Sequence, residues 1–319
     1  MKNIICFGGF YCTNIGNEFY DKGMMYILNN LCKEKFRIIH TSDLPQYFWA
    51  SYSQKTLFDH VSFFFENKNV DYVVIGGPVL DILSLENWKK HIEYFLKNNI
   101  KVILLSAGGS TYNKEEVSYV KNFLKTNRLY ALISRDSVAY ELYNMYFEHS
   151  YDGICNAFLI PKYYKPYSFN SKPYYVLNFE SIREPLIQIE TGSVKISGKR
   201  RLKYYNTCID GKYVIRTKHT CFMEHRKKYF EPNIYISDVY EDYLNIYANA
   251  DGVFSDRVHA CVATLAQGGR AMLFNDTARG ALFERVGVNN IRNELCSADM
   301  NYIETECKKM ENYVLGLFQ

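Results

Sequence analysis

The segment Ser255–Ala260 carries the residue types best suited to anion chemistry in this sequence. Its Arg257 and His259 stand two positions apart, where a short apolar run passes into a helical pattern. A guanidinium presents a planar fork of donors that matches a carboxylate or a phosphate. An imidazole can donate to an anion or move a proton near neutral pH. We expect both side chains to point to one site, although either residue alone could serve as an ordinary salt bridge or helix cap.

A second polar segment, Asn14–Glu18, follows the first apolar run and opens a helical pattern. The N-terminus of a helix offers free N–H donors and the positive end of the helix dipole. The loop formed by Asn14, Gly16 and Asn17 is therefore a candidate ligand-binding segment. A further cation, Arg279, follows shortly after the Ser255–Ala260 segment.

Glycine pairs follow three of the apolar runs, at Gly8-Gly9, Gly76-Gly77 and Gly108-Gly109. In open parallel sheets the ligand crevice lies just beyond the carboxyl ends of the strands. Glycine at those ends allows backbone N–H groups to approach an anion closely. Any single pair could simply form the tight turn into the next helix. Three pairs along one edge favour a ligand cleft.

The elements that would position these residues alternate between strands and helices. Continuous apolar runs, typical of strands buried on both faces, occur at residues 4–7, 72–75, 102–105 and 130–133. Apolar residues at helical spacing occur at residues 19–31, 86–98 and 115–126. This alternation predicts an α/β fold in which crossover helices connect the strands of a parallel sheet.

The second half of the chain repeats this organisation after a proline-rich segment at residues 161–173, which holds three of the seven prolines and predicts a linker. Strands are predicted at residues 174–177, 233–236, 252–255 and 271–274. Helices are predicted at 238–250, with Asp238 as N-cap, at 280–286 and at 300–317. Another helix is predicted to begin near Arg257 and to include residues 260–266. We therefore predict domains at 1–160 and 161–319, with the last helix able to pack back on the first domain. The pattern is weak between residues 178 and 232.

Composition, net charge and missing sequence motifs exclude several classes of protein. The chain has 319 residues, 48% of them hydrophobic, which excludes a disordered chain. Its net charge of +4 is too small to indicate a nucleic-acid partner. The sequence contains no P-loop, no dinucleotide fingerprint after the first strand and no nucleophile elbow. A P-loop enzyme, a nicotinamide or flavin enzyme and an α/β-hydrolase are therefore not expected.

The cysteines and the N-terminus predict a cytoplasmic protein. Nine cysteines without a C-x-x-C pair indicate reduced, mostly buried thiols. The first apolar run is too short for a signal peptide, and no run is long enough to span a membrane. The basic cluster Lys199–Lys203 is expected to be a solvated loop or hairpin, with contact to the acceptor or to the inner membrane face as the alternative. The spacing within His219–His225 fits no common zinc pattern, so no metal is expected.

Several motifs together give this sequence a family resemblance. They are Asn14–Glu18, Gly76-Gly77, Ser134–Ser137, Tyr151–Gly153 and, above all, YANADGVFSDRVHACVATLAQGGRAMLF at residues 247–274. With them the chain resembles the polysaccharide pyruvyl transferase family over most of residues 1–160 and 233–290. The resemblance implies two Rossmann-like domains whose parallel sheets face a cleft, as in GT-B glycosyltransferases. It also implies transfer of the enolpyruvyl group of phosphoenolpyruvate to two hydroxyls of a sugar, which forms a ketal.

The resemblance implies roles for the candidate residues. Arg257 and Arg279 would hold the phosphate or carboxylate, His259 would donate to the anion and shuttle a proton, and Arg135 would close the site from the first domain. The segment with Asn14, Gly16 and Asn17 and the turns with Gly76, Gly77 and Gly108 would contact the acceptor sugar or the phosphate. The donor is phosphoenolpyruvate, no other cofactor is implied, and the acceptor is a sugar or a lipid-linked saccharide. Asn17 replaces the usual acid and cannot act as a base, and Arg279 stands where a lysine is common.

Two other functions remain open at this point. A nucleotide-sugar glycosyltransferase of the same architecture would use Arg257 and Arg279 to hold a diphosphate, and residues 178–232 would determine its specificity. A non-catalytic sugar- or nucleotide-binding protein would fit the loss of the acid at Asn17. The oligomeric state is not indicated by the sequence.

Overall fold

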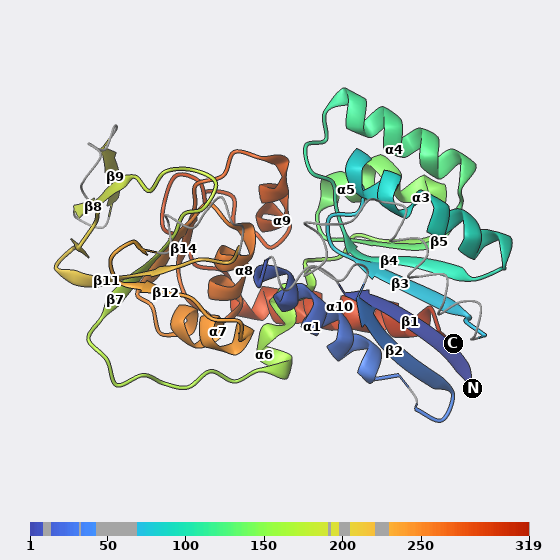
Figure 1. Cartoon of the computed structure of the whole chain (residues 1–319), viewed down its shortest axis with the longest axis horizontal. Helices are drawn as coiled ribbons and strands as arrows, with labels where there is room; N and C mark the ends of the chain where they lie inside the picture. The colour runs from blue at the N-terminus through green and yellow to red at the C-terminus, as the bar shows by residue number, and fades with distance from the viewer. Residues whose placement is uncertain are drawn as a thin grey trace.

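The computed structural model of the chain describes residues 1–8, 14–31, 33–42, 69–190, 193–197, 205–220 and 230–318. Two sheets, one from each half of the sequence, lie next to each other with helices packed on them (Figure 1). Strands and helices alternate through both halves. The predicted α/β class with two Rossmann-like units is therefore confirmed.

The first sheet is wholly parallel, with strand order β2-β1-β3-β4-β5-β6. Its strands are β1 (Lys2–Gly8), β2 (Phe36–Ser42), β3 (Tyr72–Gly76), β4 (Lys101–Ala107), β5 (Leu129–Ser134) and β6 (Phe147–Tyr151). Along β1, Ile4 and Cys6 belong to one apolar cluster, whereas Ile5 and Phe7 belong to the cluster on the other face. Burial of both faces is the reason for the continuous apolar runs in the sequence. The edge strands β2 and β6, with more mixed sequences, were not predicted.

Helices on the two faces of this sheet come from different parts of the chain. One face is covered by α3 (Ile82–Lys97), α4 (Lys114–Thr126) and α5 (Ser137–Tyr143), and the other by α1 (Gly16–Asn29) and α10 (Met300–Gly316) (Figure 1). The side chains of Asp81, Asn113 and Asp136 accept backbone N–H groups at the starts of α3, α4 and α5. These caps fix each helix start close to the carboxyl edge of the sheet.

The second sheet has the order β10-β11-β7-β13-β14, with β12 paired to β11. Its strands are β7 (Tyr174–Asn178), β10 (Cys208–Ile209), β11 (Lys212–Thr217), β12 (Ile234–Tyr235), β13 (Gly252–Ser255) and β14 (Ala271–Leu273), all parallel except β10. Its helices include α7 (Tyr240–Ala248), α8 (Val258–Ala266) and α9 (Ala281–Glu284). The prediction of Asp238 as an N-cap is wrong, because α7 begins at Tyr240 with Val239 at that position. The antiparallel hairpin of β8 (Leu186–Glu190) and β9 (Ser193–Ser197) lies on the side of the second sheet that is remote from the first (Figure 1), and its Ile187 joins the apolar cluster of the second sheet.

The two halves share contacts over a long interface. A short connection formed by the 3₁₀ helix η3 (Asn156–Leu159) and α6 (Ile160–Tyr163) packs against α1 and α8. The last helix returns to the first sheet, where the Tyr130 hydroxyl donates to the Leu317 carbonyl at 3.1 Å. The domain boundary between residues 160 and 161 stays a prediction. Within the part of the chain that the structure describes, no helix is long and apolar enough to cross a membrane.

Candidate active site

The carboxyl edge of the first sheet holds Arg135 beneath a glycine turn. Arg135 follows β5, is 2% exposed, and donates from Nη2 to the Gly109 carbonyl at 3.1 Å. A Cβ on Gly108 would lie 2.4 Å from Arg135 Nε, so only glycine at that position leaves room for the guanidinium. The Nε atom is buried, lies 3.7 Å from an Asp136 carboxylate oxygen and makes no hydrogen bond to the residues that the structure describes. A buried guanidinium donor is thus left available at this edge.

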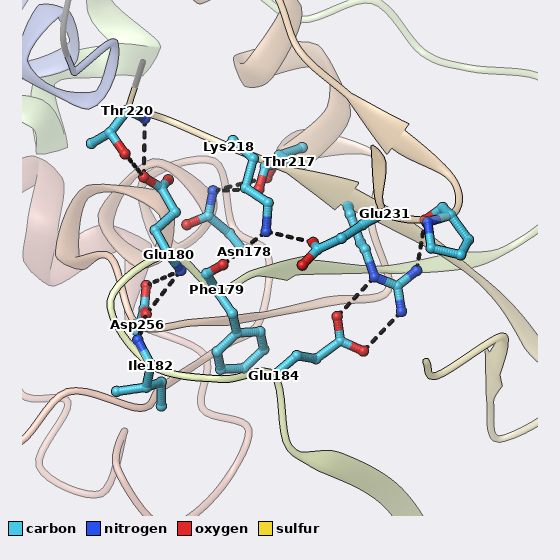
Figure 2. Close-up of polar contacts among 12 residues, drawn as sticks. Asn178, Phe179, Glu180, Ile182, Glu184, Thr217, Lys218, Thr220, Glu231 and Asp256 are labelled. Carbon is cyan, nitrogen blue, oxygen red and sulfur yellow. Dashed lines mark hydrogen bonds and ion pairs between the residues drawn. The ribbon is translucent and has the colours of Figure 1, made fainter. Parts of the chain in front are cut away.

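The matching edge of the second sheet carries Arg257 and His259. Arg257 is the N-cap residue of α8 and His259 is its second residue, so both leave the end of β13 as predicted. Between β13 and Arg257, the buried Asp256 carboxylate accepts the backbone N–H groups of Glu180, Ser181 and Ile182 at 2.6–3.1 Å. Figure 2 shows Asp256 beside Glu180 and Ile182. This carboxylate ties the segment after β7 to the end of β13. It therefore fixes the backbone from which Arg257 projects.

His259 lies among positive charges from both halves of the chain. Desolvation lowers the pKa of His259 well below its ordinary value, and the charges of Arg135, His219, Arg257 and Arg279 lower it further. Its Nε2 atom is buried without a hydrogen-bond partner among the described residues. The structure thus gathers the three candidate arginines, Arg135, Arg257 and Arg279, around the neutral imidazole of His259. An anion placed here would relieve the repulsion between them.

Arg279 reaches from the second half of the chain to the first. It lies in the 3₁₀ turn after β14, is exposed, and donates from Nη2 to Ser110 Oγ at 2.8 Å. Partial desolvation lowers the pKa of its guanidinium, and the charges of Arg135 and Arg257 act in the same direction, whereas Asp81 opposes them. These charges place Arg279 close to the other two arginines.

An ionised carboxylate balances part of this positive charge. Burial raises the pKa of Glu180, but the charges of Arg257 and His219 and the donors on Thr220 and His219 outweigh it, so the pKa is lowered. In Figure 2 the Glu180 carboxylate points to Thr220, whereas Lys218 points to Glu231, with an N–O distance of 2.7 Å. Lys218 is therefore neutralised by Glu231, and Arg257 is the cation beside Glu180.

The family model for polysaccharide pyruvyl transferases matches residues 14–275 of this sequence. That range spans most of the chain. It includes nine of the ten site residues predicted from the sequence, and only Arg279 lies beyond it. The chain belongs to the polysaccharide pyruvyl transferase family. It is accordingly a transferase, as the motif resemblance predicted.

Solved structures show that this pyruvyl transferase family member has a GT-B-like fold. The Staphylococcus aureus MnaA–UDP structure matches with a TM-score of 0.56 and 11% identity, covering 99% of this chain and 91% of that one. The UDP-GlcNAc 2-epimerase from Neisseria meningitidis, bound to UDP-GlcNAc, matches with a TM-score of 0.55 and 12% identity, covering 99% and 94%. At such low identity the likeness establishes the fold alone. No functionally curated protein matches the chain significantly.

In this pyruvyl transferase family member, the loop at the start of α1 does not offer the free N–H donors that the sequence predicted. The N–H groups of Gly16 and Asn17 are not free, because they donate to the side-chain and backbone oxygens of Asn14 at 3.1 and 3.0 Å. Asn14 Nδ2 in turn donates to Asn17 Oδ1 at 3.2 Å. A Cβ on Gly16 would lie 2.8 Å from His219 Nδ1 and 3.2 Å from His259 Cβ. The loop therefore satisfies its own donors, and Gly16 allows α1 to approach two histidines.

His219 is a component of the site that the sequence predictions considered only for metal binding. Its carbonyl accepts the Ile15 N–H at 2.9 Å, and its Nε2 lies 2.5 Å from the Tyr247 hydroxyl. Burial lowers the pKa of His219 to about 4, which Glu180 opposes and Arg257 reinforces. Its place just after an apolar strand, β11, is the signal that could have identified it. Residues 221–225 of the His219–His225 segment, where no metal was expected, lie outside the described residues, and those that are described contain no cluster able to hold a metal ion.

Tyr20 of α1 lies between the glycine turn after β3 and His259 in the second half of the chain. Its ring centroid lies 5.2 Å from that of His259 at a tilt of 48°. Gly77 has a φ of +87°, and a Cβ there would lie 2.8 Å from the Tyr20 hydroxyl. Gly76 packs beside Met24, because a Cβ there would lie 3.2 Å from the Met24 sulfur. The two glycines thus let α1 pack against the end of β3, and their contact with a ligand stays a prediction.

Proposed function

We propose that this protein transfers the enolpyruvyl group of phosphoenolpyruvate to a sugar of a cell-surface polysaccharide or its precursor, forming a pyruvate ketal. The observation that carries the proposal is the set of three guanidinium charges around the neutral imidazole of His259, whose Nε2 has no hydrogen-bond partner among the described residues. Family membership supplies the reaction class. The site supplies the charge that a small, highly anionic donor requires.

Phosphoenolpyruvate matches this charge distribution because it carries a phosphate and a carboxylate on a three-carbon frame. Guanidinium groups bind both anions through paired donors. We assign Arg257 and Arg279 to the phosphate or carboxylate and Arg135, whose buried Nε makes no hydrogen bond within the described part of the chain, to the same anion from the first half. Asn17 cannot act as a base, and with Asn14 it is assigned to positioning.

The proposed chemistry moves one proton to carbon and removes one from each of two hydroxyls. Protonation of the methylene carbon creates an oxocarbenium-like centre at the neighbouring carbon, to which the first sugar hydroxyl adds with loss of its proton. The bond to the phosphate oxygen then breaks, and the second hydroxyl closes the ring with loss of its proton. The products are the ketal and inorganic phosphate. His259 is the group assigned to the first proton transfer.

Anion binding would prepare His259 for that step. Without a ligand, the neighbouring guanidinium charges disfavour its protonated form. A bound phosphate and carboxylate would offset the local positive charge and raise the pKa of the imidazole. His259 would then carry a proton only when the donor is present, which limits unproductive proton transfer.

The first test is release of phosphate from phosphoenolpyruvate in the presence and absence of candidate sugar acceptors. We expect release only with an acceptor, and we expect Arg257→Ala to lower its rate about 10²–10³-fold while unfolding remains cooperative. Arg270→Ala is the matched control, because that exposed guanidinium donates only to the Asp251 carbonyl among the described residues. An Arg257→Ala variant with the parental rate, or one that no longer folds, would contradict the assignment.

The second candidate function is that of a nucleotide-sugar glycosyltransferase. It is favoured by the fold, which is shared with structures whose names include UDP or UDP-GlcNAc. A thermal-shift comparison of phosphoenolpyruvate with UDP, CMP and GDP separates the two, since a ligand at 100 times its dissociation constant adds about 2.7 kcal/mol to stability. Stabilisation by UDP alone would replace the first proposal. Binding without turnover would indicate a non-catalytic protein.

The acceptor and the location of the protein belong to the same proposal. We assign the acceptor to the sugars or lipid-linked saccharides and the protein to the cytoplasmic side of the membrane. The basic cluster at residues 199–203, which could contact such an acceptor or a membrane surface, lies outside the described residues.

A further inference from the structure

Arg279 is held by two residues from the other half of the chain. Its Nη2 donates to Ser110 Oγ at 2.8 Å, and Ser110 Oγ donates to Asp81 Oδ2 at 2.7 Å. A serine hydroxyl has one hydrogen and two lone pairs. Because the Ser110 hydroxyl donates its hydrogen to Asp81, it can only accept a hydrogen bond from Arg279. The Asp81 charge is thereby relayed to the guanidinium through one hydroxyl.

Asp81 and Ser110, which together form this relay to Arg279, are both held in place by further hydrogen bonds. The other oxygen of Asp81 accepts the Ser84 N–H at 2.8 Å and caps α3. The Ser110 N–H donates to Glu116 Oε1 at 3.1 Å, and the same oxygen accepts the N–H groups of Thr111 and Tyr112. A helix cap and a buried carboxylate thus fix both members of the relay. The Arg279 side chain is the one long, flexible group in it.

Arg279 needs such a contact because its neighbours repel it. The charges of Arg135 and Arg257 disfavour its guanidinium, and the residue is exposed, so solvent offers it other conformations. Among the described residues, Ser110 is the one hydrogen-bond acceptor of the guanidinium, which leaves its other donors for a ligand. The relay can therefore hold Arg279 beside the two other arginines without occupying its binding capacity.

We infer that Ser110 and Asp81 are positioning residues that orient Arg279 for anion binding. The inference rests on the proposed function for the role of Arg279 toward phosphoenolpyruvate. Ser110 acts through Arg279 and needs no contact with the substrate.

The kinetic test compares Ser110→Ala with Ser84→Ala, a matched variant whose hydroxyl donates to the Pro78 carbonyl at 3.1 Å near the same helix start. We expect Ser110→Ala to raise the KM for phosphoenolpyruvate about 10-fold or more, as for the loss of a hydrogen bond to a charged group, with a smaller change in kcat. Ser110→Thr, which keeps the hydroxyl, should recover most of the loss. Ser84→Ala should leave the KM unchanged, and equal effects of Ser110→Ala and Ser84→Ala would overturn the inference.

A double-mutant cycle distinguishes positioning from a general structural role. If Ser110 acts through Arg279, Ser110→Ala should have no further effect on KM in the Arg279→Ala background. A structural defect would instead add its full effect in both backgrounds. Full additivity would overturn the inference and leave the proposed function standing.

A measurement without substrate separates this inference from the proposed function. Phenylglyoxal labelling of Arg279, followed by peptide mass spectrometry, reports how freely the guanidinium moves. We expect its labelling rate to rise several-fold in Ser110→Ala and in Asp81→Asn, which keeps an oxygen for the Ser84 N–H, and to stay unchanged in Ser84→Ala. Unchanged labelling in both relay variants would overturn the inference. A rise in labelling without any turnover of phosphoenolpyruvate would support the relay and refute the proposed function.

Discussion

The imidazoles of His259 and His219 remain neutral at pH 7 within a strongly cationic site. For His259 the causes are desolvation followed by the charges of three neighbouring arginines and the proximity of His219, and for His219 the main cause is burial. Neighbouring guanidinium groups penalise an imidazolium because like charges repel in a poorly solvated environment. A histidine in this state gains a proton readily only when an anion arrives. This is the residue-scale basis of the proposed coupling between donor binding and proton transfer.

The pKa of His219 predicts how stability depends on pH. Its folded value of about 4 lies below the unfolded value of 6.5, so between these values the unfolded chain binds a proton that the folded chain does not. Stability should therefore fall as the pH falls from 6.5 toward 4, by up to about 1.4 kcal/mol per pH unit from this residue. In urea unfolding at pH 7 and pH 5, His219→Gln should reduce the loss of stability by about 2 kcal/mol.

His219→Gln suits this measurement because the glutamine amide can still reach the Tyr247 hydroxyl that His219 Nε2 contacts. The comparison uses the difference between two pH values, so a constant effect of the substitution on stability cancels. His219 is largely neutral between pH 5 and pH 7, so its replacement changes the charge around His259 little, and the contribution of His259 to the difference nearly cancels. The same pH-dependent loss in the variant and the parent would show that His219 titrates normally in the folded chain.

At the scale of elements, the turns that end the strands determine which side chains enter the site. The carboxyl ends of β3, β4 and β5 lie along one edge of the first sheet, because all three strands are parallel neighbours. The turn after β4 needs glycine because Arg135 passes within 2.4 Å of the position that a Cβ would take. Glycine here serves the placement of a guanidinium in addition to any approach of a ligand to the backbone.

Gly108→Ala should displace Arg135 and lower turnover. The added methyl group would also lie 2.9 Å from Asp136 Oδ2, so the guanidinium and its neighbouring carboxylate must both shift. We expect kcat/KM for phosphoenolpyruvate to fall about 10²-fold, as for the loss of one charged donor. Gly316→Ala is the control, since among the described residues no heavy atom outside its chain neighbours and its own helix backbone lies within 4 Å of the added Cβ, and it should keep the parental kinetics. Equal activity of the two variants would refute the packing argument.

At the scale of the whole molecule, the two sheets share one apolar core. A single cluster of buried residues includes Ile4 and Tyr72 from the first sheet, Val176 and Val253 from the second, and Met310 from the last helix. Arg285 adds a polar link, with ion pairs to Asp152 at 3.2 Å and Glu306 at 2.6 Å. If either half of the chain unfolded alone, the apolar residues of the other half that pack against it would be exposed to water.

This shared core predicts that the chain unfolds in one step. Differential scanning calorimetry should show one transition, with a calorimetric enthalpy equal to the van 't Hoff enthalpy. Independent domains with a small polar interface would instead unfold separately. Two resolved transitions, or a stable fragment containing only the first sheet, would contradict the prediction.

Local periodicity determined much of this protein before any tertiary contact was known. The apolar runs at 4–7 and 102–105 predicted strands buried on both faces, and the helical spacing between them predicted crossover helices. Arg257 was a candidate because it directly follows a strand, a position that any parallel sheet directs to one edge, whereas Arg135 was assigned through the family motif at Ser134–Ser137. The motif at residues 247–274 identified the family. Such signals are readable because strands, helices and motifs depend on residues close in the sequence.

Only the tertiary structure decided which side chains meet and which donors remain available. Ser110 lies 169 residues from Arg279, and His219 contacts the loop at Ile15, so no local pattern connects them. The same packing showed that Gly16 and Asn17 have already used their N–H groups and that His259 Nε2 has found no partner among the described residues. Hydrogen bonds depend on distance and direction in space, and these are set when the apolar faces of both halves pack together.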